Sequence, residues 1–311
     1  MRSPGEYRGV ERDFISATEQ GKNDAWRYIV GTMVVLFFWL VLGSFPLIAA
    51  FAWAQFDGDP ATTIDPATGM IRGVDPLWGG YLVTNLSFPV FFLGVFLAVR
   101  VLHGRGLRTL VTPAPSIRWR RVAQGFGLWL LLVAVSTGLE ILLYPSGFAW
   151  NKVGIGRYAL FVGLALIFTP IQTTTEELFF RGYLLQASGR VLPTRVVPTL
   201  VNGALFALPH IFNPELSRGP VLLMLYYFLM GAFFSWVTLR DGTAELALGA
   251  HASNNLFVAL LINFEGSALQ TPSLIVSTRF DPLYEIIGSL VSIVVFAGLL
   301  LHGNRDVNGK A

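Results

Sequence analysis

The 311-residue chain contains no cysteine, and only 13% of its residues are charged. Without cysteine there is no disulfide bond, no thiolate metal site and no cysteine nucleophile. Soluble domains carry about 25% charged residues, so the low charge excludes a water-soluble enzyme with a single core. The chain also lacks the GxSxG and HExxH motifs, and no serine is placed by spacing beside a histidine. Serine-hydrolase chemistry and HExxH zinc-protease chemistry are therefore not indicated.

Apolar residues make up 53% of the chain, and its mean hydropathy is +0.59. A membrane-spanning helix needs about 20 mostly apolar residues. The sequence therefore predicts an all-α polytopic membrane helix bundle with about eight transmembrane helices. The first apolar stretch is longer than a signal-peptide core, so we expect it to be retained. The expected spans are 28–56, 78–99, 122–143, 158–179, 196–210, 221–239, 244–263 and 283–302.

The positions of Lys and Arg predict the orientation of these spans. With the N-terminus inside, 17 of the 22 basic residues fall on the cytoplasmic side, as the positive-inside rule requires. Both termini are then cytoplasmic, and the loop with Asp57, Asp59, Asp65 and Asp75 lies outside. The net charge of only +3 does not indicate nucleic acid as a partner. The cluster of Arg118, Arg120 and Arg121 predicts some attraction to anionic lipid of the bilayer.

Ionisable residues inside membrane spans are costly and usually functional, and here they lie in three later spans. Glu177 and Arg181 are four residues apart, which predicts an ion pair on one helix face, whereas Glu176 points to another face. His251 and Asn255 share a polar face by the same spacing, and His210 lies on the span between. We expect Glu176, Glu177, His210, His251 and Asn255 to line one cavity that opens toward the cytoplasm.

These side chains suit the hydrolysis of a peptide bond. A carboxylate and an imidazole can activate one water molecule, and a second imidazole with a carboxamide can stabilise the oxyanion that develops. The same residues offer an alternative, because Glu176, His210 and His251 would supply one oxygen and two nitrogen ligands for zinc. We favour a reaction without a cofactor, and zinc stays open.

Three motifs in chain order resemble the CPBP (ABI) family. They are Glu-Glu-x-x-x-Arg at 176–181, Phe-x-x-x-His at 206–210 and His-x-x-x-Asn at 251–255. That family comprises intramembrane proteases related to type II CAAX prenyl endopeptidases and to bacteriocin-processing or self-immunity proteins.

The resemblance implies a role for each matching residue. Glu176 and His210 would activate water, and His251 and Asn255 would form the oxyanion hole. Glu177 and Arg181 would hold the Glu176 carboxylate in place. Glu177 would also be a candidate for a direct part in catalysis. The substrate would be a membrane-associated peptide or protein, with a prenylated C-terminus if the host makes one.

The expected spans, together with the resemblance, which covers about 158–263, divide the chain. We expect a cytoplasmic segment at 1–26, three transmembrane helices in 27–157, a catalytic core in 158–263, and a last helix with a cytoplasmic tail in 264–311. The protein would be an integral multi-pass membrane protein, in the plasma membrane if the host is a prokaryote. Two alternatives to a peptidase remain: a family member that binds a partner without proteolysis, and a proton-coupled transporter, since intramembrane Glu and His also form proton relays.

Overall fold

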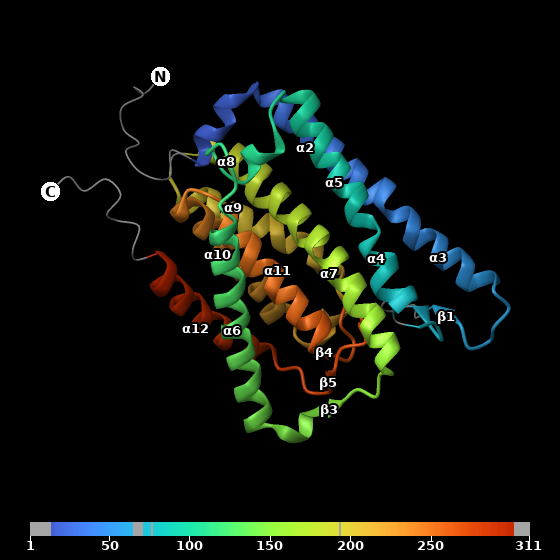
Figure 1. Cartoon of the computed structure of the whole chain (residues 1–311). Helices are drawn as coiled ribbons and strands as arrows, with labels where there is room; N and C mark the ends of the chain where they lie inside the picture. Colours follow the sequence, from blue (N-terminus) through green and yellow to red (C-terminus); the bar gives the residue numbers. More distant parts are fainter. Residues whose placement is uncertain (1–13, 65–70, 76, 193, 302–311) are drawn as a thin grey trace.

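The computed structural model describes residues 14–64, 71–75, 77–192 and 194–301. Long helices run side by side in one bundle (Figure 1). Residues 14–24, which are the described part of the N-terminal segment, lie with α8 at one end of this bundle, and strands β3, β4 and β5 lie at the opposite end. The fold class predicted from the sequence is confirmed: the protein is an all-α membrane helix bundle.

Within the described residues, six helices are long and apolar enough to cross a membrane. The first contains α2 (Ala25–Leu36) and α3 (Phe45–Phe56), joined by a π-helical segment and a short 3-10 segment. The second, Leu77–Leu102, contains α4 (Val83–Asn85) and α5 (Ser87–Leu97). The other four contain α6 (Trp119–Leu143), α7 (Ile155–Glu177) with α8 (Leu185–Val191), α10 (Pro220–Asp241) and α12 (Pro282–Leu301).

The fifth and seventh expected spans are shorter helices. α9 (Val196–Ala207) has 12 residues and continues into a 3-10 segment, Leu208–Phe212. α11 (Glu245–Leu260) has 16 residues, because the chain turns into a strand before residue 263, where we expected the span to end. The expected number of eight crossings therefore stays a prediction.

In the part of the chain that the structure describes, five short strands lie in the connections between helices. β1 (Thr63–Ile64) pairs antiparallel with β2 (Ile71–Arg72) in the loop after α3. β3 (Phe148–Trp150), β4 (Ile262–Phe264) and β5 (Ile275–Ser277) form a small sheet in the order β3-β5-β4. The sheet joins the chain after α6 to the chain after α11. Asp65 and His302 lie outside the described residues.

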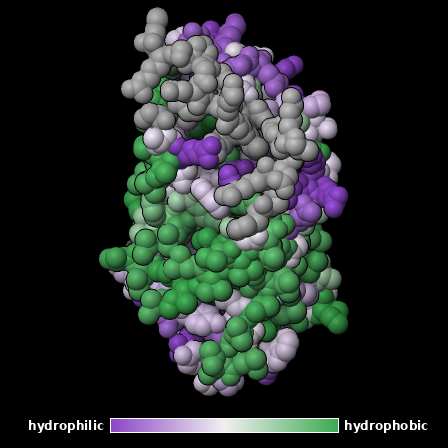
Figure 2. Space-filling view, turned by 90° about the vertical axis from the view of Figure 1, so that its left-hand side faces the viewer, coloured by the Kyte–Doolittle hydropathy of each residue, from purple (hydrophilic) through white to green (hydrophobic). Residues whose placement is uncertain are grey.

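The surface of the bundle suits lipid rather than water. Leu142 on α6 and Val294 on α12 are 78% and 70% exposed, and many other large apolar side chains are exposed as well. Figure 2 shows a broad apolar band across the middle of one face, with hydrophilic residues toward both ends. Apolar patches of this extent mark a membrane contact in a protein with spans of this length. The chain is an integral multi-pass membrane protein.

Helix α11 lies unusually close to α6, and glycine makes this approach feasible. A Cβ atom on Gly249 would lie 2.0 Å from the Val122 carbonyl oxygen, and one on Gly125 would lie 2.3 Å from that of Leu246. Small residues permit this backbone contact between membrane helices. The position of α11 matters because this helix carries His251 and Asn255.

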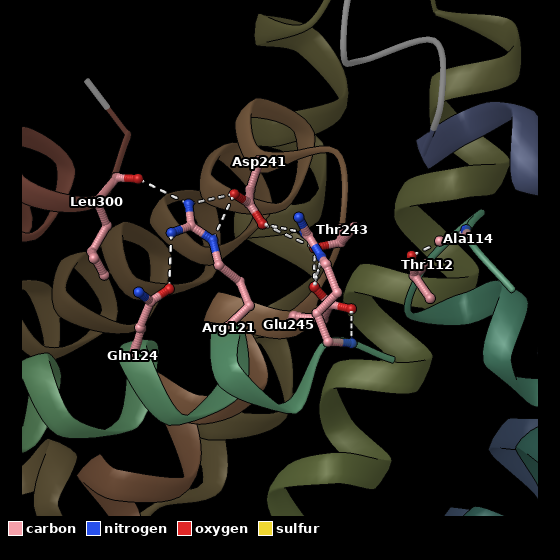
Figure 3. A network of polar contacts seen from close by, with 9 residues as sticks. Thr112, Ala114, Arg121, Gln124, Asp241, Thr243, Glu245 and Leu300 are labelled. Atoms are coloured by element: carbon pink, nitrogen blue, oxygen red, sulfur yellow. Dashed lines mark hydrogen bonds and ion pairs between the residues drawn. The ribbon is translucent and has the colours of Figure 1, made fainter. Parts of the chain in front are cut away.

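A network of charges fixes the start of α11 at the end of the bundle where the N-terminal segment packs (Figure 3). The fully buried Glu245 carboxylate accepts hydrogen bonds from the Arg118 backbone N–H at 2.7 Å and from Arg118 Nε at 2.6 Å. Asp241 pairs with Arg118 and Arg121. Two of the three arginines that we expected to attract lipid therefore pair with buried carboxylates of the protein.

Candidate functional site

The Glu-Glu-x-x-x-Arg motif lies where α7 changes into a π-helical segment, Leu178–Leu184. The predicted ion pair is present: Arg181 Nη1 lies 2.8 Å from Glu177 Oε1, and both side chains are completely buried. The Arg181 guanidinium also lies over the rings of Phe206 and Phe234, at 4.2 and 5.3 Å from their centroids. π-Helical turns occur frequently at functional sites. The pair and the aromatic rings hold Arg181 in the interior.

His251 on α11 lies between the two glutamates of α7. Its Nδ1 is 2.7 Å from Glu177 Oε1, and its Nε2 is 3.5 Å from Glu176 Oε2. An ionised Glu177 can only accept, so this bond places a proton on Nδ1 of His251. Glu177 thus orients His251, a contact that spacing along the chain does not reveal. We also expected Glu177 to hold the Glu176 carboxylate in place, and this role stays a prediction.

His210 lies in the 3-10 segment after α9. Its Nδ1 is 2.9 Å from the carbonyl oxygen of Phe206, which accepts the Nδ1 proton and leaves Nε2 without one in the neutral ring. The ring stacks on Tyr227 of α10 with a centroid distance of 3.9 Å. His210 is therefore held from two sides.

Asn255 lines the site next to Asn254. Asn254 Nδ2 donates to Asn255 Oδ1 at 3.2 Å, and Trp129 Nε1 donates to Asn254 Oδ1, also at 3.2 Å. Among the described residues, no group accepts a hydrogen bond from Asn255 Nδ2. The carboxamide N–H groups of Asn255 can therefore donate to a bound group.

One cavity of about 440 Å³ connects these side chains. Of the five residues expected to line it, Glu177 alone does not, because it lies behind His251 and is 1% exposed. Gln172 on α7 also lines the cavity, and its Nε2 lies 3.5 Å from Glu176 Oε1. The residues that come together at the cavity wall are Glu176, His210, His251 and Asn255.

The cavity extends toward the end of the bundle that carries the small sheet (Figure 1). Phe148 of β3, Phe264 of β4 and Ser277 of β5 line it. Among the described residues, none from 100–121, 181–195 or 236–248 does so. Cavity and N-terminal segment thus face opposite ends, so our two expectations of cytoplasmic termini and a cytoplasmic cavity cannot both hold. If the orientation that the basic residues predict holds, the cavity opens toward the outside; the orientation and the cytoplasmic opening therefore stay two predictions that exclude each other.

Zinc would need Glu176, His210 and His251 to converge. No three or more histidine, aspartate or glutamate side chains of the described residues, which include all three, are arranged to hold a metal ion. The Nδ1 atoms of both histidines are engaged, with Phe206 and with Glu177, so only their Nε2 atoms could serve as metal ligands. The side chains as arranged do not fit a metal, and no step of the mechanism proposed below involves one.

Sequence reasoning missed three polar residues of the site. Gln172 stands four residues before Glu176, so helical spacing could have revealed it. Glu215 and Tyr227 support His210 through contacts between separate elements. A glutamate in a short connection and a tyrosine in an apolar helix carry no signal of that kind in the sequence.

Known proteins show which family has this site. The family described as Type II CAAX prenyl endopeptidase Rce1-like matches residues 156–257, which contain all three motifs. The uncharacterized protein YyaK of Bacillus subtilis (strain 168) is 34% identical over 292 residues, which are 94% of this chain and 96% of YyaK. The chain belongs to the CPBP family. It is a CAAX-protease-like membrane protein, as the motifs predicted. No solved structure matches the chain.

Proposed function

We propose that this CPBP-family protein is an intramembrane endopeptidase that hydrolyses a peptide bond near the membrane. One observation carries the proposal: Glu176, His210, His251 and Asn255, from three separate helical segments, line the same cavity. A protein that only binds a partner would not need a carboxylate, two imidazoles and a carboxamide at one place. The substrate is a membrane-associated peptide or protein, prenylated only if the host makes such a group.

The mechanism begins with a water molecule between Glu176 and His210. Glu176 takes a proton as the water oxygen attacks the carbonyl carbon, and His210 orients the water through its unprotonated Nε2. The carbonyl oxygen becomes an oxyanion, which accepts hydrogen bonds from His251 Nε2–H and Asn255 Nδ2–H. Glu176 then returns its proton to the leaving amine as the C–N bond breaks. No covalent intermediate forms with the protein.

Charge balance supports this role for His251. Buried charges are more stable when they are paired with opposite charges, so two positive charges would suit the two carboxylates of the motif. Arg181 supplies one of them beside Glu177. In the proposed mechanism His251, between Glu176 and Glu177, supplies the other when both of its ring nitrogens carry protons, and its Nε2–H then donates to the oxyanion.

The test is a cleavage assay in liposomes with a library of membrane-associated peptides, each with and without a prenyl group. We expect the wild-type protein to release defined fragments and Glu176→Gln to release none, because it lacks the base. Glu265→Gln is the matched control, since Glu265 is exposed and does not line the cavity. Cleavage that persists in Glu176→Gln would refute the mechanism. The absence of cleavage in the wild type across the library would favour a binding function.

A further inference from the structure

We infer that Glu215 and Tyr227 are positioning residues, which hold the His210 imidazole at the angle that water activation requires. This inference rests on the proposed function of His210. It assigns a task to a buried carboxylate that the proposed mechanism does not use. Glu215 is 5% exposed and lines the same cavity as His210.

The Glu215 carboxylate is fixed by hydrogen bonds from three directions. Its Oε1 accepts from Tyr227 Oη at 2.6 Å and from Asn213 Nδ2 at 3.0 Å. Its Oε2 accepts from the backbone N–H of Ala268 at 2.9 Å. A carboxylate with three donors has little freedom. Glu215 therefore ties the start of the connection before α10 to α10 itself and to the chain after α11.

Tyr227 transmits this anchor to His210. Its hydroxyl ends on Glu215, and its ring lies nearly parallel to the imidazole, with an interplanar angle of 27° and a centroid distance of 3.9 Å. Asn213 Nδ2 also donates to the Tyr227 hydroxyl at 3.1 Å. The hydroxyl thus has two partners that set the position of the ring.

His210 needs this support because of where it lies. It belongs to a 3-10 segment of five residues, which has weaker hydrogen-bond geometry than an α-helix. The bond from Nδ1 to the Phe206 carbonyl fixes one edge of the imidazole. The Tyr227 ring fixes its plane, and together they aim Nε2. A displacement of about 1 Å in a catalytic group can cost about 100-fold in rate.

The kinetic test uses variants that remove one part of the support at a time. Tyr227→Phe keeps the ring and loses the hydroxyl, and Glu215→Ala removes the anchor. We expect each to lower kcat about 10-fold, the worth of one hydrogen bond, with KM changed less than about 2-fold. Tyr227→Leu removes the stacking as well and should lower kcat about 100-fold. Tyr158→Phe is the matched control, because the Tyr158 hydroxyl also joins two elements but lies away from the cavity.

A second measurement does not depend on activity. The chain has only four histidines, so the ring nitrogens can be assigned by ¹⁵N NMR with His→Gln variants. We expect wild-type His210 to show one tautomer, with the proton on Nδ1. In Tyr227→Phe and Glu215→Ala the imidazole is free to tilt, which weakens its Nδ1–H bond to the Phe206 carbonyl, so the signals should move toward the average of the two tautomers. Tyr158→Phe should keep the wild-type values.

The two measurements separate this inference from the proposed function. Tautomer averaging in Tyr227→Phe and Glu215→Ala supports the inference, and a reduced kcat at constant KM supports it further. An unchanged tautomer in both variants overturns it, whatever the activity. If the wild type cleaves no peptide, the cleavage assay refutes the proposed function. The ¹⁵N signals then still decide whether Glu215 and Tyr227 hold His210.

Discussion

Glu177 and His251, 74 residues apart in the chain, are joined by a hydrogen bond of 2.7 Å between Oε1 and Nδ1. The same Oε1 receives Arg181 Nη1 at 2.8 Å. One carboxylate oxygen thus links the π-helical segment after α7 to α11. This arrangement places the second glutamate of the motif behind the cavity, where it orients His251.

Glu177→Gln should therefore impair both stability and activity. A glutamine has no charge to balance Arg181, and loss of one member of a buried ion pair costs about 3–5 kcal/mol. We expect a lower melting temperature in detergent and a lower kcat, because the neutral amide oxygen of glutamine is a weaker acceptor for His251 Nδ1–H than a carboxylate. Glu265→Gln, on an exposed side chain, serves as the control. A Glu177→Gln protein with wild-type stability and turnover would show that the contact is dispensable.

Two glycines on α6 form a matched pair for testing the contact between α6 and α11. Gly125→Ala places a methyl group 2.3 Å from the Leu246 carbonyl oxygen, whereas a Cβ on Gly127 meets nothing within 4 Å. Overpacking of this kind costs about 1–3 kcal/mol, so Gly125→Ala should lower the melting temperature and displace His251. Gly127→Ala should leave both the melting temperature and turnover near the wild-type values. Equal melting temperatures for the two variants would contradict the close packing.

His103, just beyond the second long helix, predicts a loss of stability in acid. Burial lowers the pKa of His103 below its usual value of 6.5, and its ring nitrogens contact the Lys22 carbonyl at 2.7 Å and the Tyr183 hydroxyl at 2.9 Å. As the pH falls below about 6.5, the unfolded chain takes up the proton first, so stability decreases by at most about 1.4 kcal/mol per pH unit. Melting temperatures at pH 8 and pH 5.5 measure this loss, and His103→Asn should reduce it. The same pH dependence in the variant would assign the effect to other groups.

Local patterns in the sequence predicted much of the fold and part of the site. Hydrophobic length located the helices, because a span must be apolar over its full length. Spacing along one helix predicted the pair of Glu177 and Arg181, which the structure confirms. The cost of burying polar groups in lipid predicted one cavity lined by Glu176, Glu177, His210, His251 and Asn255, and all of them except Glu177 line it.

Contacts between elements remote in sequence could not be predicted in this way. The hydrogen bond of Glu177 to His251 and the stacking of Tyr227 on His210 depend on how α7, α10 and α11 pack. The chain after α7 continues as a helix to Val191 through a π-helical segment, although hydropathy suggested an end near residue 179. The end of the bundle toward which the cavity extends could not be predicted either, because it depends on the connections that carry the small sheet, and these have no periodic pattern.

The side of the membrane from which substrate enters follows from the cavity and the orientation together. Single cysteines introduced at Ser116 and Glu265 test it. Both residues are exposed and lie at opposite ends of the bundle. The chain has no native cysteine that the reagent could label instead. In intact cells we expect an impermeant maleimide to label Glu265→Cys and to label Ser116→Cys only after permeabilisation. The reverse pattern would place the cavity on the cytoplasmic side and refute the orientation predicted from the basic residues.

The central claim is that Glu176 activates water without a metal, and one measurement tests it directly. With a cleaved peptide in hand, turnover in liposomes is compared before and after exhaustive chelation, for the wild type and for Asn255→Ala. The account predicts wild-type turnover unchanged by chelation, and a loss of about 10²–10³-fold in Asn255→Ala, the worth of an oxyanion donor. Loss of wild-type turnover on chelation, restored by zinc with stoichiometric metal in the protein, would contradict it.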